Sequence, residues 1–245
     1  MEVNKIYQGD CLEVMKDIPD KSIDMILCDL PYGTTACKWD TIIPFEPLWE
    51  QYKRIIKDNG AIVLCGQEPF SSYLRISNIE DYKYDWYWEK ERLTNVFQVK
   101  RRPGKTIECI SIFYKEQPNY IPQKSEHTGR LVKNRVGKNG RFSITLQGKK
   151  GQVKPINYRD DRTRDPTQVL KINRDNNMKN VHPTQKPVAL FEYLIKTYTN
   201  EGDLVLDNCA GSGTSGVACQ NLNRNYILIE KEPKYIDVIN KRIKI

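Results

Sequence analysis

A four-residue segment near the N-terminus, Asp29-Leu30-Pro31-Tyr32, places a carboxylate, a rigid turn and an aromatic ring directly after an apolar run. An amino group on an aromatic ring is a poor nucleophile, because its lone pair is conjugated with the ring. The Asp29 carboxylate and the Leu30 carbonyl can each accept one N–H and stabilise charge that develops on that nitrogen. Pro31 stiffens the loop, and Tyr32 offers a flat face for an extruded base. An ordinary X-Pro turn is the alternative. The functional interpretation of this segment therefore depends on a second segment further along the chain.

The second segment, residues 207–214, follows another apolar run and contains Gly211 and Gly213. Glycine lets the backbone approach a ligand closely and adopt positive φ angles. The next predicted strand ends at Glu230, where an acidic side chain can bind ribose hydroxyls. The segment resembles the glycine loop that holds S-adenosylmethionine. Gly216 also completes a G-x-G-x-x-G spacing, so a nicotinamide cofactor and a structural turn remain alternatives, although a dehydrogenase has no use for an Asp-x-Pro-Tyr loop.

Alternating buried strands and helices must carry both segments. The apolar runs predict strands over 6–10, 22–29, 61–65, 84–90, 107–115, 203–207 and 225–230. Helical spacing predicts helices over 11–18, 44–58, 69–76, 187–199, 213–221 and 233–245, with Asn59-Gly60 as the stop of the second. This alternation is typical of a doubly wound, mostly parallel α/β sheet.

The positive charge is concentrated in one part of the chain. Residues 100–180 contain 20 Lys and Arg against 7 Asp and Glu, whereas the remainder contains 19 against 24. A basic block of this kind suits a surface that contacts phosphates, and an ordinary solvated lysine-rich region is the alternative. Residues 117–181 are rich in Asn, Arg, Lys, Gln and Gly and are too long for a bare loop. We therefore predict an inserted, basic subdomain there.

Other features narrow the class of protein. No apolar run is long enough to span a bilayer, and the N-terminus lacks a signal-peptide pattern. The seven cysteines are scattered and include no Cys-x-x-Cys pair, which favours buried thiols in a reducing cytoplasm over disulfides or a zinc site. We therefore expect a cytoplasmic protein without a metal. Of the two histidines, His127 is expected at the surface and His182 as a loop-fixing residue.

Together these segments resemble the amino-DNA methyltransferases, in the beta class, whose base-holding motif precedes the cofactor loop in a circularly permuted order. That family often has Asp-Pro-Pro-Tyr at the first segment and Asp-Pro-Phe-Ala-Gly-Ser-Gly-Thr at the second, so this chain departs from it at Leu30, Asn208 and Cys209. Residues 182–187 resemble the family segment that closes over the methionine end of the cofactor. The stretch from Val96-Phe97 to Phe113-Tyr114-Lys115 is also similar.

The resemblance implies a seven-stranded sheet of the S-adenosylmethionine-dependent methyltransferase type. It implies a catalytic and cofactor-binding domain over 1–116 and 182–245, and a target-recognition region over 117–181. The implied catalytic residues are Asp29, Leu30, Pro31 and Tyr32. The implied cofactor-binding residues are Asp10, at the adenine, and Asp29, Thr184, Lys186, Asp207, Ala210, Gly211, Gly213, Thr214 and Glu230. The implied DNA-binding residues are Arg130, Lys133, Arg135, Lys138 and Arg141.

The implied activity is methyl transfer from S-adenosylmethionine to adenine N6 in duplex DNA, with base flipping, S-adenosylhomocysteine as product and no metal. Adenine is preferred because relatives that act on cytosine N4 more often have Ser in place of the leading Asp29. Cytosine N4 is the alternative, followed by an RNA or protein-glutamine methyltransferase and an inactive DNA-binding relative. The expected partners are double-stranded DNA, a second copy of the chain in a homodimer, and a cognate restriction endonuclease; no membrane contact is expected.

Overall fold

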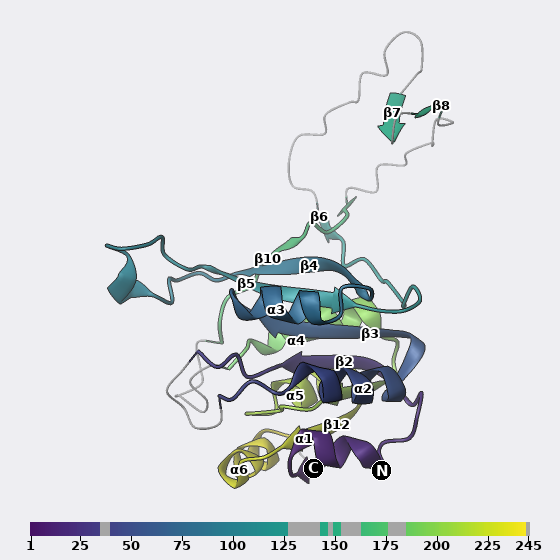
Figure 1. Cartoon of the computed structure of the whole chain (residues 1–245), viewed down its shortest axis with the longest axis vertical. Coiled ribbons are helices and arrows are strands. Elements are labelled where there is room, and N and C mark those ends of the chain that lie inside the picture. The colour runs from purple at the N-terminus through teal and green to yellow at the C-terminus, as the bar shows by residue number, and fades with distance from the viewer. Residues whose placement is uncertain (35–39, 127–142, 147–148, 153–162, 176–184, 244–245) are drawn as a thin grey trace. The chain divides into compact units, whose positions relative to one another are not determined.

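The computed structural model describes residues 1–34, 40–126, 143–146, 149–152, 163–175 and 185–243. The chain forms two compact units. The first comprises Met1–Pro122 and Thr167–Ile245, and the second comprises Gln123–Pro166. The first unit contains the main sheet and all the described α-helices (Figure 1).

An eight-stranded sheet forms the centre of the first unit, in the order β1-β12-β11-β2-β3-β5-β4-β10. Pairing is parallel from β1 to β3 and between β4 and β10, and antiparallel where β5 pairs with β3 and β4. The strands are β1 (Lys5–Gln8), β2 (Ile23–Asp29), β3 (Ile56–Gly66), β4 (Tyr82–Glu89), β5 (Ile107–Phe113), β10 (Val169–Lys171), β11 (Leu204–Asp207) and β12 (Asn225–Glu230).

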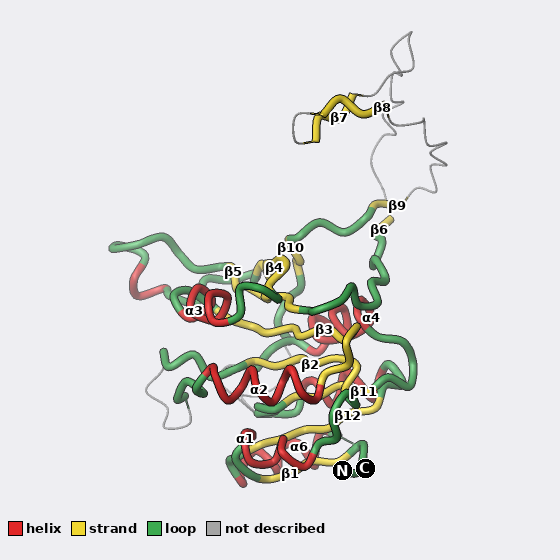
Figure 2. The backbone as a smooth tube through the Cα atoms, turned by 45° about the vertical axis from the view of Figure 1, so that its right-hand side comes forward, coloured by secondary structure: helices red, strands yellow, loops and turns green. Residues whose placement is uncertain are grey.

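Helices cover both faces of this sheet, as Figure 2 shows. Side chains of α1, α2 and α3 pack in one core, and those of α4, α5 and α6 pack in the other. The helices are α1 (Cys11–Val14), α2 (Phe45–Ile55), α3 (Phe70–Ser77), α4 (Val188–Tyr198), α5 (Thr214–Asn221) and α6 (Pro233–Arg242), with 3-10 turns η1 (Met15–Asp17) and η2 (Val96–Gln98).

The central strands owe their apolar runs to burial on both faces. In β2, Met25 and Leu27 pack in the core of α4 and α5, whereas Ile26 and Cys28 pack in the core of α2. All four side chains are fully buried, as expected for a parallel strand between two helical layers. The doubly wound α/β class predicted from the sequence is therefore confirmed.

The direction of chain connection reverses between β11 and β2, which pair in parallel. From β11 the chain passes through α5 to β12 on one side, and from β2 it passes through α2 to β3 on the other. Loops that leave two such strands diverge and open a crevice at the carboxyl ends. Asp207 and Asp29 are the last residues of β11 and β2, so both predicted segments begin at this crevice.

Two predicted elements were wrong in detail. The sheet has eight strands rather than seven, because β10 adds to the edge at β4. The second helix ends at Ile55 rather than at residue 58, because Ile56 already pairs with Ile23 in β3. Gly60 is not a helix stop but lies within β3, where a Cβ would come within 2.9 Å of the Asp24 carbonyl oxygen.

The second unit contains two short antiparallel strand pairs, β6 (Ser125–Glu126) with β9 (Thr163–Arg164) and β7 (Ser143–Leu146) with β8 (Lys149–Gln152). Its bounds fall inside the predicted insertion of 117–181, whose residues 169–171 instead form β10 of the main sheet. Target recognition by this region stays a prediction. Within the described ranges no helix is long and apolar enough to cross a membrane.

Candidate active site

One cavity of about 1160 Å³ lies at the crevice between β11 and β2 and brings the two predicted segments together. Its lining includes most of the predicted catalytic and cofactor-binding residues, namely Asp10, Asp29, Leu30, Pro31, Tyr32, Lys186, Asp207, Ala210, Gly211, Thr214 and Glu230. Residues more than 170 positions apart in the sequence therefore border one space. Their assignment to individual roles stays a prediction.

The remaining predicted residues are not in this lining. Gly213 has a φ of 76° and precedes α5, where a Cβ would come within 2.8 Å of Ile239 Cγ2 on α6. Its place in the fold is therefore a tight turn against α6. Thr184 and the two histidines lie outside the described residues, as do the five predicted DNA-binding residues Arg130, Lys133, Arg135, Lys138 and Arg141.

The loop after β2 packs against the hydrophobic core of α2 and α3. The Leu30 side chain is buried and packs in the core of α2 and α3, so this position contributes its backbone to the cavity wall. The Tyr32 ring packs on Phe70, the first residue of α3, with 5.1 Å between ring centroids. The Tyr32 hydroxyl donates a hydrogen bond to Asp29 Oδ1. The carboxylate and the ring are thus fixed relative to each other.

The backbone beyond Tyr32 is fixed by Asp40. The Gly33 and Thr34 amides donate to its two carboxylate oxygens, at 2.8 and 2.9 Å. Gly33 has a φ of 66°, a conformation that glycine adopts without strain. Asp40 itself is buried. The base-holding loop is therefore anchored at both ends, as a preorganised site requires.

A buried ion cluster lies behind Asp29. Lys186 donates to Asp29 Oδ2 at 2.6 Å, and its Nζ lies 3.2 Å from Glu108 Oε2. Lys90 pairs with the other oxygen of Glu108. The side chains of Lys186, Glu108 and Lys90 are only 6, 12 and 8% exposed. The cluster alternates charge from Lys90 through Glu108 and Lys186 to Asp29.

The pKa values follow from this alternation. Burial by itself disfavours the Lys186 ammonium, but the Asp29 and Glu108 carboxylates outweigh it and raise the pKa of Lys186. Burial likewise opposes the Glu108 carboxylate, but Lys186 and Lys90 lower its pKa below the ordinary value. Burial and the nearby Asp29 charge raise the pKa of Tyr32. Lys186 and Glu108 are therefore ionised and Tyr32 is a neutral hydrogen-bond donor around neutral pH.

At the other end of the crevice, Asp207 organises the glycine loop. Its carboxylate accepts the Ser215 hydroxyl at 2.5 Å and the Cys209 amide at 3.1 Å. Burial raises the pKa of Asp207 to about 7, although these hydrogen bonds oppose the shift. Asp207 thus ties the loop to the start of α5.

Glu230, at the end of β12, connects this loop to the neighbouring strand. Its carboxylate accepts the Gly211 amide at 2.7 Å and the Glu232 amide at 2.8 Å. Burial raises the pKa of Glu230 despite these bonds. Asp10 caps α1 through the Leu12 amide at 3.0 Å. Since a carboxylate has about four acceptor positions, Glu230 and Asp10 each retain capacity for a ligand.

Sequence reasoning missed Glu108, Lys90 and Asp40. Glu108 and Lys90 belong to the antiparallel pair β4–β5, whose register places Trp88 opposite Glu108. An acidic residue within the apolar run 107–113 was the one available signal, since a buried carboxylate requires a partner. Asp40 follows residues 35–39, which lie outside the described ranges. The surrounding sequence gives no sign that Asp40 binds the Gly33 and Thr34 amides.

The side chains around the cavity fit S-adenosylmethionine. Carboxylates at Asp10 and Glu230 suit hydroxyl and amino donors, and the backbone at Gly211, with a φ of 53°, presents no side chain to a ligand. Among the described residues, no group of three or more His, Cys, Asp or Glu is placed to hold a metal ion.

A doubly wound sheet whose switch-point cavity joins a glycine loop to an Asp-x-Pro-Tyr loop is the arrangement expected for the methyltransferases that the sequence resembles. The DNA methylase family model of N6 and N4 enzymes matches residues 23–241, so the chain belongs to this family. Among curated relatives, the type II methyltransferase M.HinfI of Haemophilus influenzae is 29% identical, over 99% of this chain and 68% of the relative. The type II methyltransferase M2.MboI of Moraxella bovis is 27% identical, over 97 and 86%.

Solved structures agree with this membership. The M1.HpyAVI-SAM complex has a TM-score of 0.64 and 27% identity, covering 98% of this chain and 99% of that one. The cytosine-N4-specific PvuII DNA methyltransferase has a TM-score of 0.69 and 17% identity, covering 99 and 86%. At that identity the second likeness concerns the fold alone. The resemblance inferred from the sequence is confirmed at the level of the family.

Proposed function

We propose that this DNA methylase transfers a methyl group from S-adenosylmethionine to N6 of adenine in duplex DNA. The observation that carries the proposal is the cavity that the Asp29–Tyr32 loop and the glycine loop share, with Asp29 backed by the buried Lys186. The family membership supports the reaction type. The leading Asp29 supports adenine, because relatives that act on cytosine N4 more often have Ser there.

The base-holding loop supplies the chemistry of the amino group. Asp29 Oδ1 and Oδ2 already accept from Tyr32 and Lys186, and each oxygen retains a lone pair for a substrate N–H. The Leu30 carbonyl accepts the second N–H, so that the nitrogen lone pair is released from the ring and aimed into the cavity. Asp29 then takes the proton that the alkylated amino group loses. Lys186 balances the Asp29 charge throughout, because Glu108 keeps it in place.

The opposite end of the cavity holds the cofactor, which when bound supplies an activated methyl group on a sulfonium. Glu230 would accept hydrogen bonds from the ribose hydroxyls, and Asp10 would contact the adenine. The backbone of Ala210 and Gly211 would contact the cofactor, with Asp207 and Thr214 fixing the loop. The M1.HpyAVI-SAM complex, at 27% identity, supports this use of S-adenosylmethionine. Thr184 remains a proposed contact.

Duplex DNA is the proposed partner, and 117–181 is the proposed target-recognition region, with its five basic residues as phosphate or base contacts. The names of the relatives, type II methyltransferases, support a role in restriction-modification beside an endonuclease. A homodimer and that endonuclease stay predictions.

The test is transfer of labelled methyl from S-adenosylmethionine to mixed-sequence duplex DNA, followed by mass spectrometry of the nucleosides. The proposal predicts N6-methyladenine. N4-methylcytosine would keep the reaction and overturn the choice of base. Absence of any labelled nucleoside from a protein that binds the cofactor would overturn DNA as the substrate and direct the same assay to RNA and protein.

A further inference from the structure

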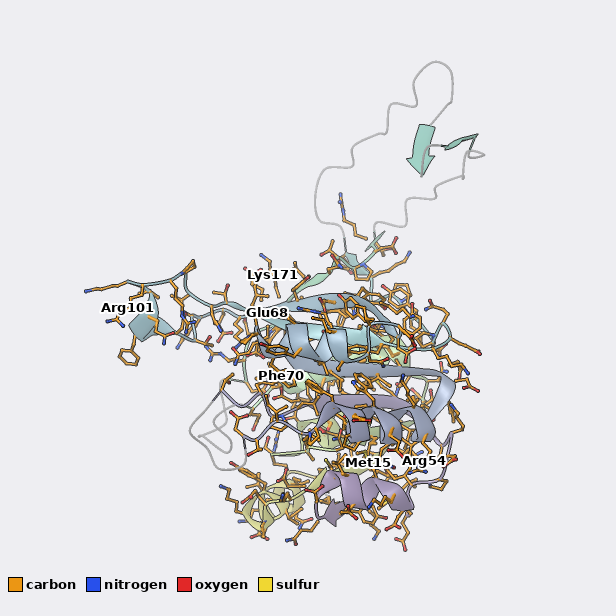
Figure 3. The ribbon with its side chains drawn as sticks, viewed as in Figure 1. Met15, Arg54, Glu68, Phe70, Arg101 and Lys171 are labelled. Carbon is orange, nitrogen blue, oxygen red and sulfur yellow. The ribbon has the colours of Figure 1, made fainter. Side chains whose placement is uncertain are left out.

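A basic arm, residues 90–105, connects β4 to β5 and extends away from the edge of the sheet (Figures 1 and 3). Backbone hydrogen bonds tie its two sides together, from Lys90 to Thr106 at 2.7 Å and from Thr94 to Lys105 at 3.1 Å. The Asn95 side chain adds two more, donating to the Pro103 carbonyl at 3.0 Å and accepting the Lys105 amide at 2.6 Å. The arm is thus a built element with a defined tip.

The tip presents apolar side chains to solvent. Phe97, in the η2 turn, has a relative exposure of 103%, and Val96 beside it has 59%. Single exposed apolar residues are ordinary on protein surfaces, but a fully exposed aromatic ring next to further exposed apolar side chains marks an interaction site. Leu93 and Val99 extend the apolar surface at 41 and 45% exposure.

Positive charge surrounds these apolar side chains. Between residues 92 and 102 the arm contains Arg92, Lys100, Arg101 and Arg102 and no acidic residue. All four are exposed, and Figure 3 labels Arg101 far from the sheet. A polyanion is the partner that this charge favours, because cations at this spacing can each neutralise a phosphate and release a counterion.

The arm also borders the candidate active site. Several of its residues line the cavity, among them Lys90, Asn95, Phe97, Arg102 and Lys105. At its base, Lys90 belongs to the ion cluster behind Asp29 through Glu108. The arm therefore forms part of the wall of the cavity that contains Asp29.

We propose that the arm is a DNA-contacting element and that Phe97 inserts into the duplex at the space vacated by the flipped base. This inference rests on the proposed function. An extruded base leaves its neighbours unstacked at a cost of a few kcal/mol, and an aromatic ring inserted between those neighbours stacks on their exposed faces and offsets part of that cost. The surrounding arginines and Lys100 would bind the phosphates on either side of the flipped nucleotide. The ring and the positive charges would therefore act on the same base step of the duplex.

The experiment compares wild type, Phe97→Ala and Phe97→Trp in single-turnover methyl transfer to a duplex whose site has first been located by mapping methylated positions in plasmid DNA. A second duplex places an abasic site opposite the target base, so that the base is already unpaired. Tyr73→Ala, which removes another exposed ring, at 62% on α3 and outside the cavity lining, is the matched control.

We expect Phe97→Ala to slow transfer on the intact duplex by about 10- to 100-fold, the scale of one lost base–aromatic stack. Phe97→Trp should retain most of the rate, and the abasic duplex should restore the Phe97→Ala rate to within about threefold of wild type. Fluorescence of 2-aminopurine at the target position should show reduced flipping only for Phe97→Ala. An equal loss on both duplexes, or no loss on either, would overturn the wedge while methylation by wild type leaves the proposed function intact. Failure of wild type on all DNA would instead overturn the proposed function.

A charge variant tests the second half of the proposal. Lys100→Ala with Arg101→Ala should weaken binding to any duplex and reduce the slope of log affinity against log salt by about 1 to 2. An unchanged slope would contradict phosphate contact by the arm. If the charge variant shows the expected decrease in slope but Phe97→Ala transfers methyl at the wild-type rate, the arm contacts DNA and the wedge is excluded.

Discussion

Replacing Glu108 by Gln should destabilise the fold, although this side chain is absent from every motif that the sequence displays. Glu108 stands between Lys90 and Lys186, and neither lysine is more than 8% exposed. Glutamine keeps the shape and a hydrogen-bond acceptor but removes the charge. Of its two carboxylate partners Lys186 would retain Asp29, and Lys90 would lose the carboxylate of Glu108.

The expected size follows from the burial of the cluster. Removing one partner from a buried ion pair costs about 3–5 kcal/mol, because the other charge is left uncompensated. Since Asp29 still partners Lys186, we expect about 3 kcal/mol, at the lower end. For a chain of this length each kcal/mol shifts the melting temperature by about 2–4 °C, so the loss should be about 6–12 °C.

Thermal unfolding followed by circular dichroism measures this shift. Glu13→Gln is the matched control, because Glu13 pairs with Lys16 at 2.7 Å but both side chains are more than half exposed. An exposed pair contributes about 0–1 kcal/mol, so the control should melt close to wild type. Equal melting temperatures for Glu108→Gln and Glu13→Gln would refute the role given to the buried cluster.

Two further variants test other parts of the site. Burial raises the pKa of Asp207 to about 7, against an ordinary 3.8, so the folded state binds this proton more tightly than the unfolded state does. The stability that results is fully present below about pH 3.8 and is lost as the pH rises to about 7. The melting temperature of Asp207→Asn relative to wild type should therefore increase by several degrees from about pH 5 to about pH 8; a constant difference would contradict the raised pKa. Gly213→Ala should destabilise more than Gly202→Ala, since both have positive φ, at 76° and 84°, but only Gly213 has a neighbour, Ile239, within 2.8 Å of the new Cβ. We expect about 1 kcal/mol for Gly202→Ala and at least twice that for Gly213→Ala in urea unfolding, and equal losses would show that packing against α6 is unimportant.

The sequence was sufficient to predict the two loops that border the crevice, because each loop is marked by a local pattern. Residues 22–29 and 203–207 are apolar runs that end in Asp29 and Asp207, and parallel strands bring their carboxyl ends to one edge of the sheet. The motifs predicted one site, and this physical rule explains why the two loops meet there. The family predicted from the motifs and the fold class predicted from the alternation of strands and helices are both confirmed.

The sequence was insufficient where the outcome depends on pairing between distant segments. The register of β4 and β5 brings Glu108 into the ion cluster, and neither strand encodes that register locally. The boundary between α2 and β3 failed for the same reason, since Ile56 continues the helical spacing of Tyr52 but pairs with Ile23. β10 could not be foreseen either, because a three-residue strand gains its stability from the partner β4.

The central claim is that Asp29 grips the amino group that is methylated. Asp29→Asn, compared with Asp58→Asn at an exposed position outside the cavity lining, should lower the single-turnover rate of methyl transfer at least about 100-fold while the affinity for S-adenosylmethionine changes only a few-fold. The control should transfer methyl at the wild-type rate. Transfer by Asp29→Asn at a rate close to wild type, with the cofactor bound normally, would contradict the account.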